Sequence, residues 1–484
     1  MTLDKLDKEL SVPDYALKVS KILKNHGYQA YIVGGWVRDM LLGNEPKDID
    51  VATDATPEEM VDVFRGYKII PTGEKYGTMT VMMESVNGYI PVEVTTFRFD
   101  GDYNDGRRPD NVEFTRELSD DLIRRDFRVN TFSYDCIDNV ILSVPGAMSD
   151  LENGSICAVG NPSERFTEDA LRMLRGCRFA SRYGFNIDHD TKDAIINLSH
   201  TIENVSMERV RDEIVGILEQ SSKPSVAFEL MRETGFLGHV LPELEECHEI
   251  EQPAQYHKYD VYWHILHTLD AVPIDYRNVL VVRLSALMHD IGKPVCREWS
   301  EKKKRWRFIG HEKVSARMAS EILKRLKLSN DIINRVIPLV RTHMLCLHLA
   351  LGSAKDKTIR KMMVNFPDEG SIQDLLVLTT ADAIGSGIKV EEDLNNIRRF
   401  QTKLDELKKE NGTGKPGIDR SDLAIDGNDI LELGVEHGPD IGNILETLLE
   451  RVLSDPAVND KETLLRFATM EMEKLKSKRV IIDE

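Results

Sequence analysis

The sequence predicts an α+β protein, with a small mixed α/β head at the N-terminus followed by domains that are almost entirely helical. Two observations support this prediction. From residue 30 to about 150 the apolar runs are short, rich in β-branched residues and interleaved with helical stretches, which is typical of a mixed sheet domain. After residue 163 apolar residues recur at helical spacing, with few strand-like runs.

Breaks in this pattern suggest how the chain is divided. Prolines occur between residues 242 and 253, and the glycine-bearing segment 411–417 is a linker by composition. With 484 residues, the chain is long enough for several cores. We expect four domains, which are a head (1–155), a helical neck (156–250), a further helical domain (251–395) and a helical tail (396–484).

Composition and charge exclude several classes of protein. The 63 basic and 82 acidic residues give a net charge of −19, which argues against a protein that coats nucleic acid over its whole surface. Local basic patches remain, one from Arg172 to Arg182 and one from Lys302 to Arg307. The composition of the second patch fits an ordinary solvated face as well as it fits a nucleic-acid-binding surface. No apolar run reaches the roughly 18 residues of a membrane span. The N-terminus has no export signal and the six cysteines are scattered, so we expect a cytoplasmic protein without an evident obligate protein partner.

The most informative stretch begins with a buried strand at residues 31–33. This strand runs into Gly34 and Gly35, which allow the backbone to approach a ligand closely, and then into a short helix that ends at Gly43. The free amide groups at the start of such a helix suit a phosphate. The pattern is neither G-x-G-x-x-G nor a P-loop, so those nucleotide-binding folds are not indicated.

A pair of aspartates follows that stretch. Asp48 and Asp50 are two residues apart on a predicted strand, so they share one face while Ile49 and Val51 face the core. Glu93, on a later strand, is a candidate third carboxylate. Carboxylate oxygens suit Mg²⁺, and two such ions can hold the attacking and leaving oxygens of phosphoryl transfer. We therefore predict a catalytic Mg²⁺ site; the alternative is a solvated strand edge.

Four motifs in order carry a resemblance to a known family. They are Gly-Gly-x-Val-Arg-Asp from residue 34, Asp-x-Asp from 48, Arg-Arg-Asp-Phe-Arg-Val-Asn from 124 and Glu-Asp-Ala-Leu-Arg from 168. Together they resemble the class II nucleotidyltransferases, the bacterial tRNA CCA-adding enzymes and poly(A) polymerases. The resemblance covers about residues 10–470, and the segment 418–468 is similar to the tRNA-binding end of CCA-adding enzymes. It implies template-independent addition of CCA to the 3′ end of tRNA from CTP and ATP.

The resemblance also implies roles for residues of the head. Asp48 and Asp50 match metal ligands, and Asp126 matches a position near the ribose. The positions that match nucleotide contacts are Gly34, Gly35, Arg38, Arg125, Asp126 and Asn130. Cations beside phosphates are reasonable electrostatics. The alternative for Arg124 and Arg125 is a surface ion pair with Asp120 or Asp121.

Base recognition is implied for the helix that follows. The matching positions are Asp169, Arg172, Arg175 and Arg178. An Asp can accept from the exocyclic amine of cytosine or adenine, while an Arg can donate to the ring nitrogen that is unprotonated in both. UTP and GTP would leave buried polar groups unpaired. The alternative is a helical i, i+3 ion pair that only stabilises the helix.

Residues 100–109 resemble a flexible loop that is present in enzymes completing CCA or adding only the final A. In enzymes that add only CC this loop is shortened. Its polar, glycine-bearing composition fits a mobile element that re-forms a pocket between additions. The loop argues against a CC-only enzyme and leaves complete CCA addition and A-only addition both open.

A second group of candidate ligands lies in the helical region. It consists of His264, with His267 as the alternate, together with His289, Asp290 and Asp382, and of His311 and His343 for a second metal position. The group resembles an HD domain, which implies a metal-dependent phosphohydrolase. Mixed nitrogen and oxygen ligands suit Mg, Mn, Co or Ni, and unpaired polar groups in an apolar helix would be costly. The alternative is a helical scaffold with poor metal affinity.

Three functions therefore compete. The leading one is CCA addition to tRNA, with Mg²⁺ in the head and a divalent transition metal as a further candidate at the HD site. The second is an A-adding enzyme or a poly(A) polymerase acting on general RNA. The third is an HD phosphohydrolase whose head is a degenerate RNA-binding module, although the intact aspartates and arginines of the head argue against it.

Overall fold

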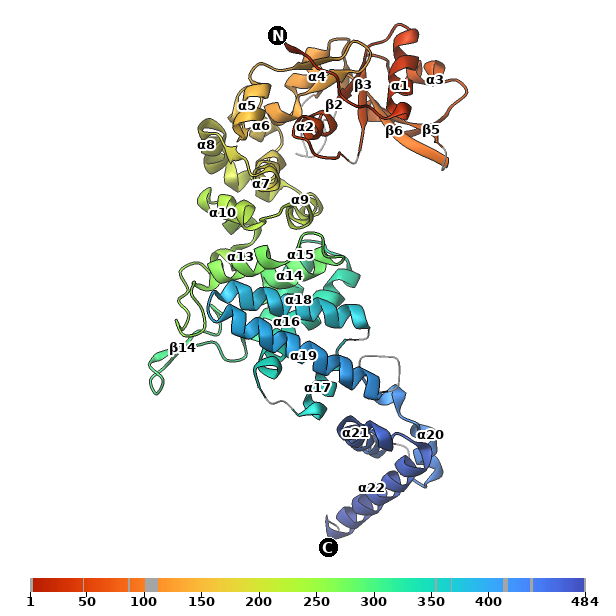
Figure 1. The fold of residues 1–484 in the computed structure, drawn as a ribbon, viewed down its shortest axis with the longest axis vertical. Coiled ribbons are helices and arrows are strands. Elements are labelled where there is room, and N and C mark those ends of the chain that lie inside the picture. Colours follow the sequence, from red (N-terminus) through yellow and green to blue (C-terminus); the bar gives the residue numbers. More distant parts are fainter. Residues whose placement is uncertain are drawn as a thin grey trace. The chain divides into compact units, whose positions relative to one another are not determined.

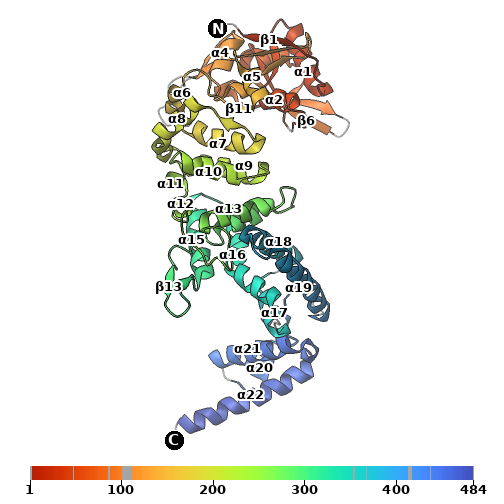
Figure 2. The same cartoon turned by 60° about the vertical axis from the view of Figure 1, so that its left-hand side comes forward.

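The computed structural model describes residues 3–46, 48–85, 88–100, 112–352, 355–366, 368–411, 417–435 and 438–482. Contacts between residues divide the chain into two compact units, Met1–Pro242 and Glu243–Glu484. Figures 1 and 2 show a sheet with helices in the first unit and mainly helices in the second. Each unit is described by itself below.

An eight-stranded sheet forms the core of the N-terminal part of the first unit (Figure 1). Its strand order is β1-β10-β9-β2-β3-β6-β5-β4. β3 and β6 run parallel and the other neighbours run antiparallel. The strands are β1 (Asp4–Asp7), β2 (Ala30–Val33), β3 (Asp50–Thr53), β4 (Lys68–Gly73), β5 (Thr78–Ser85), β6 (Gly88–Thr96), β9 (Ser133–Asp135) and β10 (Val140–Ser143).

Alternation along the strands decides which residues face the core. In β6, Val92 and Val94 are buried while Glu93 between them is exposed. The valines pack with Leu23 of α1 and Met60 of α3, so these two helices cover one face of the sheet (Figure 1). Burying each such side chain stabilises the fold by about 1.5–3 kcal/mol. Glu93 lies on the opposite face of the strand from the valines, so its carboxylate is accessible to a ligand.

Helices complete the first unit. Thr56 caps α3 through a capping box with Glu59, and α7 ends at Gly184, whose φ of 69° is typical of a helix terminus. The helices are α1 (Asp14–Asn25), α2 (Gly35–Leu41), α3 (Pro57–Val63), α4 (Leu118–Ile123), α5 (Ala147–Asn153), α6 (Pro162–Glu168), α7 (Leu171–Tyr183), α8 (His189–Leu198), α9 (Met207–Gln220), α10 (Ser225–Glu233) and α11 (Leu237–Val240), with α12 (Pro242–Glu245) at the junction of the units.

The second unit is built on apolar helices. α13, α14 and α18 are buried over much of their length and pack against one another, whereas α20, α21 and α22 share a separate apolar cluster around Leu448 and Leu464. Asp260 caps α13 by accepting from the amide of Trp263 at 2.8 Å. The helices are α13 (Val261–Ala271), α14 (Val279–Met288), α15 (His311–Arg325), α16 (Asn330–Leu351), α17 (Asp356–Met363), α18 (Glu369–Ser386), α19 (Val390–Asn411), α20 (Gly427–Glu432), α21 (Pro439–Ser454) and α22 (Lys461–Ile482).

Short paired strands also occur outside the large sheet. They are β7 (Arg98–Asp100) with β8 (Val112–Phe114), β11 (Ser155–Ile156) with β12 (Asn186–Ile187), and β13 (Glu298–Ser300) with β14 (Arg305–Arg307). The hairpin of β13 and β14 lies in the region where we expected almost only helices. Its strands span three residues each, too short for the period-2 pattern to stand out in the sequence.

The α+β prediction is confirmed by this architecture. The four domain boundaries stay predictions. Most of the expected flexible loop (100–109) and of the expected linker (411–417) lies outside the described residues. Within the described ranges, no helix combines the length and the apolar character that crossing a membrane requires.

Candidate functional site

A cavity of about 590 Å³ opens in the first unit beside the ends of β2, β3 and β6 and against α7. Its volume is within the range of small-ligand sites. It brings together twelve of the thirteen residues that the sequence analysis assigned to catalysis and nucleotide binding in the head and neck. These are Gly34, Gly35, Arg38, Asp50, Glu93, Arg125, Asp126, Asn130, Asp169, Arg172, Arg175 and Arg178.

Gly34 ends β2 in a conformation that favours glycine. Its φ is 69°, and a Cβ built there would lie 2.9 Å from Nη1 of Arg125. Arg125 itself is fixed, because Nη1 donates to the carbonyl of Asn130 at 3.1 Å and Nη2 donates to Asp121 at 3.1 Å. The glycine therefore makes room for an arginine at the wall of the cavity.

Two carboxylates of the cavity, those of Asp50 and Glu93, come from the parallel strands β3 and β6 of the large sheet. Asp50 on β3 is directly opposite Glu93 on β6. Burial raises the pKa of Asp50, the nearby charges of Glu93 and Asp48 raise it further, and Arg125 opposes them. Like charges that gather in this way favour a bound cation, so the donor set fits Mg²⁺.

Asp48 departs from the expected geometry. The prediction that it shares a strand with Asp50 is wrong, because β3 begins at Asp50, where its pairing with Val33 ends and β2 gives way to Gly34. Asp48 lies in the preceding loop, is exposed and does not line the cavity. It is close enough to raise the pKa of Asp50.

Arg38 is held at the cavity wall by several partners. Its Nε donates to Asp39 at 2.9 Å and its Nη1 donates to Oδ1 of Asn130. The guanidinium also lies 4.5 Å from the ring centroid of Tyr183. The sequence analysis missed Asp39 as a partner, although it closes the first motif.

Asp126 and the arginines of α7 form a buried network. Asp126 accepts from Nε of Arg175 at 2.7 Å and from Nδ2 of Asn130 at 2.8 Å. Burial alone would raise the pKa of Asp126, but Arg175 and the bond from Asn130 outweigh burial and hold this pKa well below its usual range. Arg178 donates to Glu213 of α9 at 2.6 Å. Glu213 was not predicted, since nothing in its sequence context marks it.

The two proposed base-reading residues have separate partners. Asp169 accepts from Nη2 of Arg209 at 2.7 Å, whereas Arg172 donates to Glu168 at 2.7 Å and to the carbonyl of Arg124 at 3.1 Å. Neither pairing is the i, i+3 ion pair between Asp169 and Arg172 that the sequence offered as an alternative. Arg209, on α9, lines the same cavity and was missed because no motif surrounds it.

The alternative for Arg124 and Arg125 is correct in one respect. Both donate to Asp121, at 2.8 and 3.1 Å. Asp121 is buried rather than on the surface, so the pair of arginines is anchored from beneath and Arg125 still lines the cavity.

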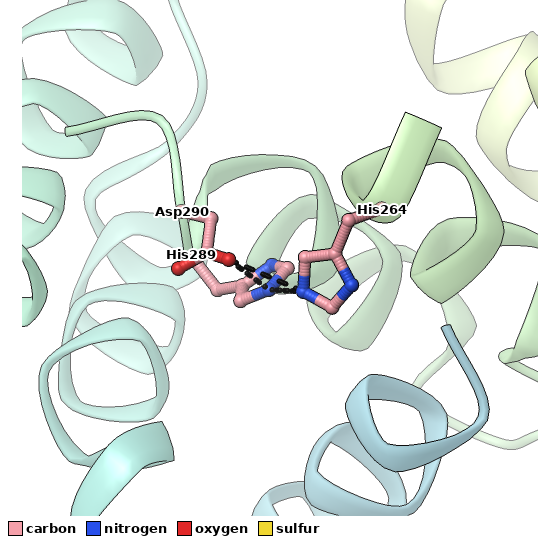
Figure 3. A group of neighbouring side chains, drawn as sticks. All are labelled: His264, His289 and Asp290. Atoms are coloured by element: carbon pink, nitrogen blue, oxygen red, sulfur yellow. Dashed lines mark hydrogen bonds and ion pairs between the residues drawn. The ribbon is translucent and has the colours of Figure 1, made fainter. Parts of the chain in front are cut away.

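A second cluster lies in the interior of the second unit. Nε2 of His264 on α13 lies 3.0 Å from Nε2 of His289 and 3.2 Å from Oδ2 of Asp290, which directly follow α14 (Figure 3). Asp382 on α18 approaches His264 at 3.2 Å. These four residues are the predicted set, and His264, His289 and Asp290 lie within the spacing of a metal site.

His311 and His343 extend the cluster on the other side of Asp290. Their Nε2 atoms lie 3.1 and 3.7 Å from its Oδ1, and these three residues form a second group with metal-ligand spacing. His267, the alternate for His264, instead packs its ring against Tyr259.

The tautomers of the histidines suit metal binding. Nδ1 of His289, His311 and His343 each lies 2.7 Å from a backbone carbonyl, which can only accept, so Nδ1 carries the proton and Nε2 presents a lone pair to the cluster. Nε2 of His311, Nε2 of His343 and Oδ1 of Asp290 are buried and have no hydrogen-bond partner in the part of the chain that the structure describes. Lone pairs and carboxylates that converge in this way fit one or two divalent cations.

Lys293 and His257 were not predicted but adjoin this cluster. Nζ of Lys293 lies 2.6 Å from Oδ2 of Asp290. Its position three residues after the aspartate, on the same turn, was the signal that could have found it. The ring of His257 packs edge-on against His264, with centroids 4.6 Å apart. Burial, followed by the charges of Lys293 and His264, lowers the pKa of His257 to about 2.

Comparison with known proteins gives the class first. Family models match as "Poly A polymerase head domain" over residues 30–157, "Probable RNA and SrmB-binding site of polymerase A" over 184–247 and "tRNA nucleotidyltransferase domain 2 putative" over 297–468. Together with the carboxylates and arginines of the cavity, they define a nucleotidyltransferase of the poly(A) polymerase type.

Full-length relatives then narrow the class. The chain is 32% identical to a CCA-adding enzyme of Geobacillus sp. (strain WCH70), over 93% of this chain and 95% of the relative. It is 31% identical to the CCA-adding enzyme of Ligilactobacillus salivarius, over 95% and 97%. The fold is similar to a Bacillus stearothermophilus CCA-adding enzyme solved in complex with CTP, with a TM-score of 0.67, 25% identity, and coverage of 96% and 98%. The chain therefore belongs to the CCA-adding enzymes.

Proposed function

We propose that this chain adds CCA to the 3′ end of tRNA, taking CTP and ATP as substrates and releasing pyrophosphate. The observation that carries the proposal is a single cavity that joins the carboxylates of Asp50 and Glu93 to the arginines of α7. The similarity to an enzyme solved with CTP, and the match to a tRNA nucleotidyltransferase domain, support the choice of substrates.

The carboxylates hold magnesium in this proposal. Asp50 and Glu93 line the cavity, and Asp48, in the loop before β3, is close enough to act on the charge of Asp50. Magnesium held by these carboxylates would lower the pKa of the tRNA 3′ hydroxyl and neutralise charge on the leaving pyrophosphate. Arg38 and Arg125 also line the cavity, where their fixed guanidinium groups would supply directed donors to the triphosphate.

Asp169 and Arg172 choose the base in this proposal. Each oxygen of Asp169 already accepts one hydrogen bond, from Arg209 or from the amide of Leu171 at 3.1 Å. A carboxylate oxygen has two lone pairs, so either can also accept from the amine of cytosine or adenine. Arg172 is held by Glu168 and by the carbonyl of Arg124, which aligns its remaining N–H groups.

The test uses full-length protein, tRNA that lacks its last three nucleotides, tRNA that ends in CC, and each labelled triphosphate. We expect incorporation of CTP and then ATP, stopping after three additions on the first tRNA and after one on the second. Activity only on tRNA ending in CC would indicate an A-adding enzyme. Long ATP tracts on unrelated RNA would indicate a poly(A) polymerase.

We infer a second activity for the second unit, that of a metal-dependent phosphohydrolase. The unpartnered ligand atoms around Asp290 favour it. His264, His289 and Asp290, with Asp382 beside them, would hold one divalent cation, and Asp290 with His311 and His343 would hold another. Such cations supply an activated water for the hydrolysis of phosphate esters.

The second activity is tested with metal-stripped protein. Mn²⁺, Co²⁺, Ni²⁺ and Mg²⁺ are added back singly, and bound metal and hydrolysis of p-nitrophenyl phosphate are measured. Binding with hydrolysis supports the proposal, and absence of both indicates a structural scaffold.

We also propose a cytoplasmic location, supported by six free cysteines, which suit a reducing compartment.

A further inference from the structure

The hairpin of β13 and β14 carries two tryptophan rings, one of which is exposed to solvent. Trp299 lies opposite Trp306 in the register, with ring centroids 5.2 Å apart at 74°. The guanidinium of Arg297 lies 4.0 Å from the centroid of Trp306 and occupies one side of that ring. Trp299 is 42% exposed, and no guanidinium among the described residues lies over its ring. An exposed tryptophan on a hairpin that projects from the helices (Figures 1 and 2) is a candidate platform for a ligand.

Basic side chains surround this platform. Lys302 and Lys303 are exposed in the turn, while Lys304 is held by Glu301 at 2.7 Å. Arg305 begins β14 and lies over the ring of Tyr256, which is 55% exposed, at 5.1 Å. In a chain of net charge −19, this concentration of cations beside exposed rings indicates a polyanionic partner.

The hairpin also forms the rim of a second cavity. Arg305, Trp306 and Arg307 line a space of about 700 Å³ that Asp290 and His343 of the candidate metal centre line as well. A ligand held along the hairpin would therefore extend toward that centre.

We propose that the β13–β14 hairpin binds single-stranded RNA, with a base stacked on Trp299 and the phosphates paired with Lys302 and Lys303. Stacking on aromatic side chains beside a basic track is how proteins hold single strands without reading their sequence. A membrane surface is the competing partner for tryptophan and lysine, but the turn of the hairpin, residues 301–304, consists entirely of exposed charged side chains and has no apolar side chain to insert into a bilayer. The choice of RNA over DNA rests on the proposed function; the geometry does not.

The test measures the affinity of the full chain for a fluorescent oligoadenylate of twelve nucleotides over a range of salt concentrations. Trp299→Ala should weaken binding about fivefold to a hundredfold, and Trp299→Phe should restore most of it, because stacking needs only an aromatic face. Lys302→Ser with Lys303→Ser should reduce the slope of log affinity against log salt by about 1.4, at about 0.7 for each phosphate contact on a single strand. The matched control, Lys313→Ser with Lys324→Ser, removes the same charge from exposed positions on α15 and should leave the slope unchanged.

Two results would overturn the proposal. One is unchanged affinity and slope in both hairpin variants. The other is Trp299-dependent binding to phosphatidylserine vesicles by a chain whose RNA binding ignores the hairpin. Failure of the proposed function gives a different result. In that case the unaltered chain would incorporate neither CTP nor ATP into tRNA, while the hairpin variants would still change oligoadenylate binding.

Discussion

The two clusters of charged residues differ in how their charged groups are paired. In the cavity of the first unit, most arginines are paired with the protein's own acids, as Arg175 is with Asp126 and Arg178 with Glu213. In the second unit, histidine lone pairs and two carboxylates converge on one point with Lys293 as the nearby ammonium. In the first cluster most arginines therefore have counter-charges without a ligand, although Asp50 and Glu93 form no ion pair among the described residues. In the second cluster the converging ligand atoms would be paired by a metal cation.

This difference indicates when each site would bind its metal. Buried polar groups without partners are costly, so the second cluster should keep a cation as a resident. Asp50 and Glu93 face an open cavity, and among the described residues the head carboxylates do not form a group with the tight spacing of the second cluster. Such a site suits a metal that arrives with the triphosphate.

The largest expected effect is on transfer. Asp50→Ala should lower CMP and AMP incorporation by about a thousandfold or more, since metal-assisted charge stabilisation contributes several kcal/mol. Metal bound to the second unit should remain unchanged in this variant, as measured by elemental analysis. Asp62→Ala, at an exposed position of α3, serves as the control and should retain transfer. Substantial residual transfer in Asp50→Ala would remove the metal role of the head.

The next effect concerns the resident metal. His264→Ala should reduce metal affinity at least about tenfold to a hundredfold, judged by titration of the stripped protein with Mn²⁺. His267→Ala is a matched control three residues along the same helix and should bind as the unaltered chain does. Transfer to tRNA should be intact in both. Equal metal affinity in the two variants would mean that the clusters do not differ as described.

A smaller effect is expected on the choice of base. Asp169→Ala should narrow the preference for CTP over UTP by about tenfold, because one hydrogen bond to a charged group contributes about 1.5–3 kcal/mol. Its overall rate should fall less than that of Asp50→Ala. Asp193→Ala, exposed on α8, is the control. Selectivity measured as the ratio of kcat/KM values, if unaltered in Asp169→Ala, would contradict the base-reading role.

The smallest effect is on stability in acid. Because the folded pKa of Asp126 lies below its unfolded value, its ionised form stabilises the fold above about pH 4, and this stabilisation is lost as the pH falls toward the folded pKa. The difference in Tm between the unaltered chain and Asp126→Asn should therefore be constant from pH 7 to 5 and shrink below pH 4. A difference that grows on acidification would contradict the depressed pKa.

Sequence reasoning located most of both sites because their residues lie in motifs. The diglycine, the two aspartates and the paired His289 and Asp290 each mark a local structure with a chemical purpose. Arg209, which lines the cavity, and Glu213, which accepts from Arg178, were missed because only the packing of α9 on α7 brings them to the site. Asp48 was placed on a strand because alternation suggested it, whereas the end of its partner strand decided otherwise.

The parallel pairing of β3 with β6 has one more consequence. Asp50 and Glu93 are held opposite each other by main-chain register, with the whole of β4 and β5 inserted between them in the sequence. Side chains alternate along a strand, so a slip of one residue would turn Glu93 into the apolar interior and bring a valine to the cavity. An insertion or deletion that shifts this ladder would thus silence the enzyme without replacing either acid.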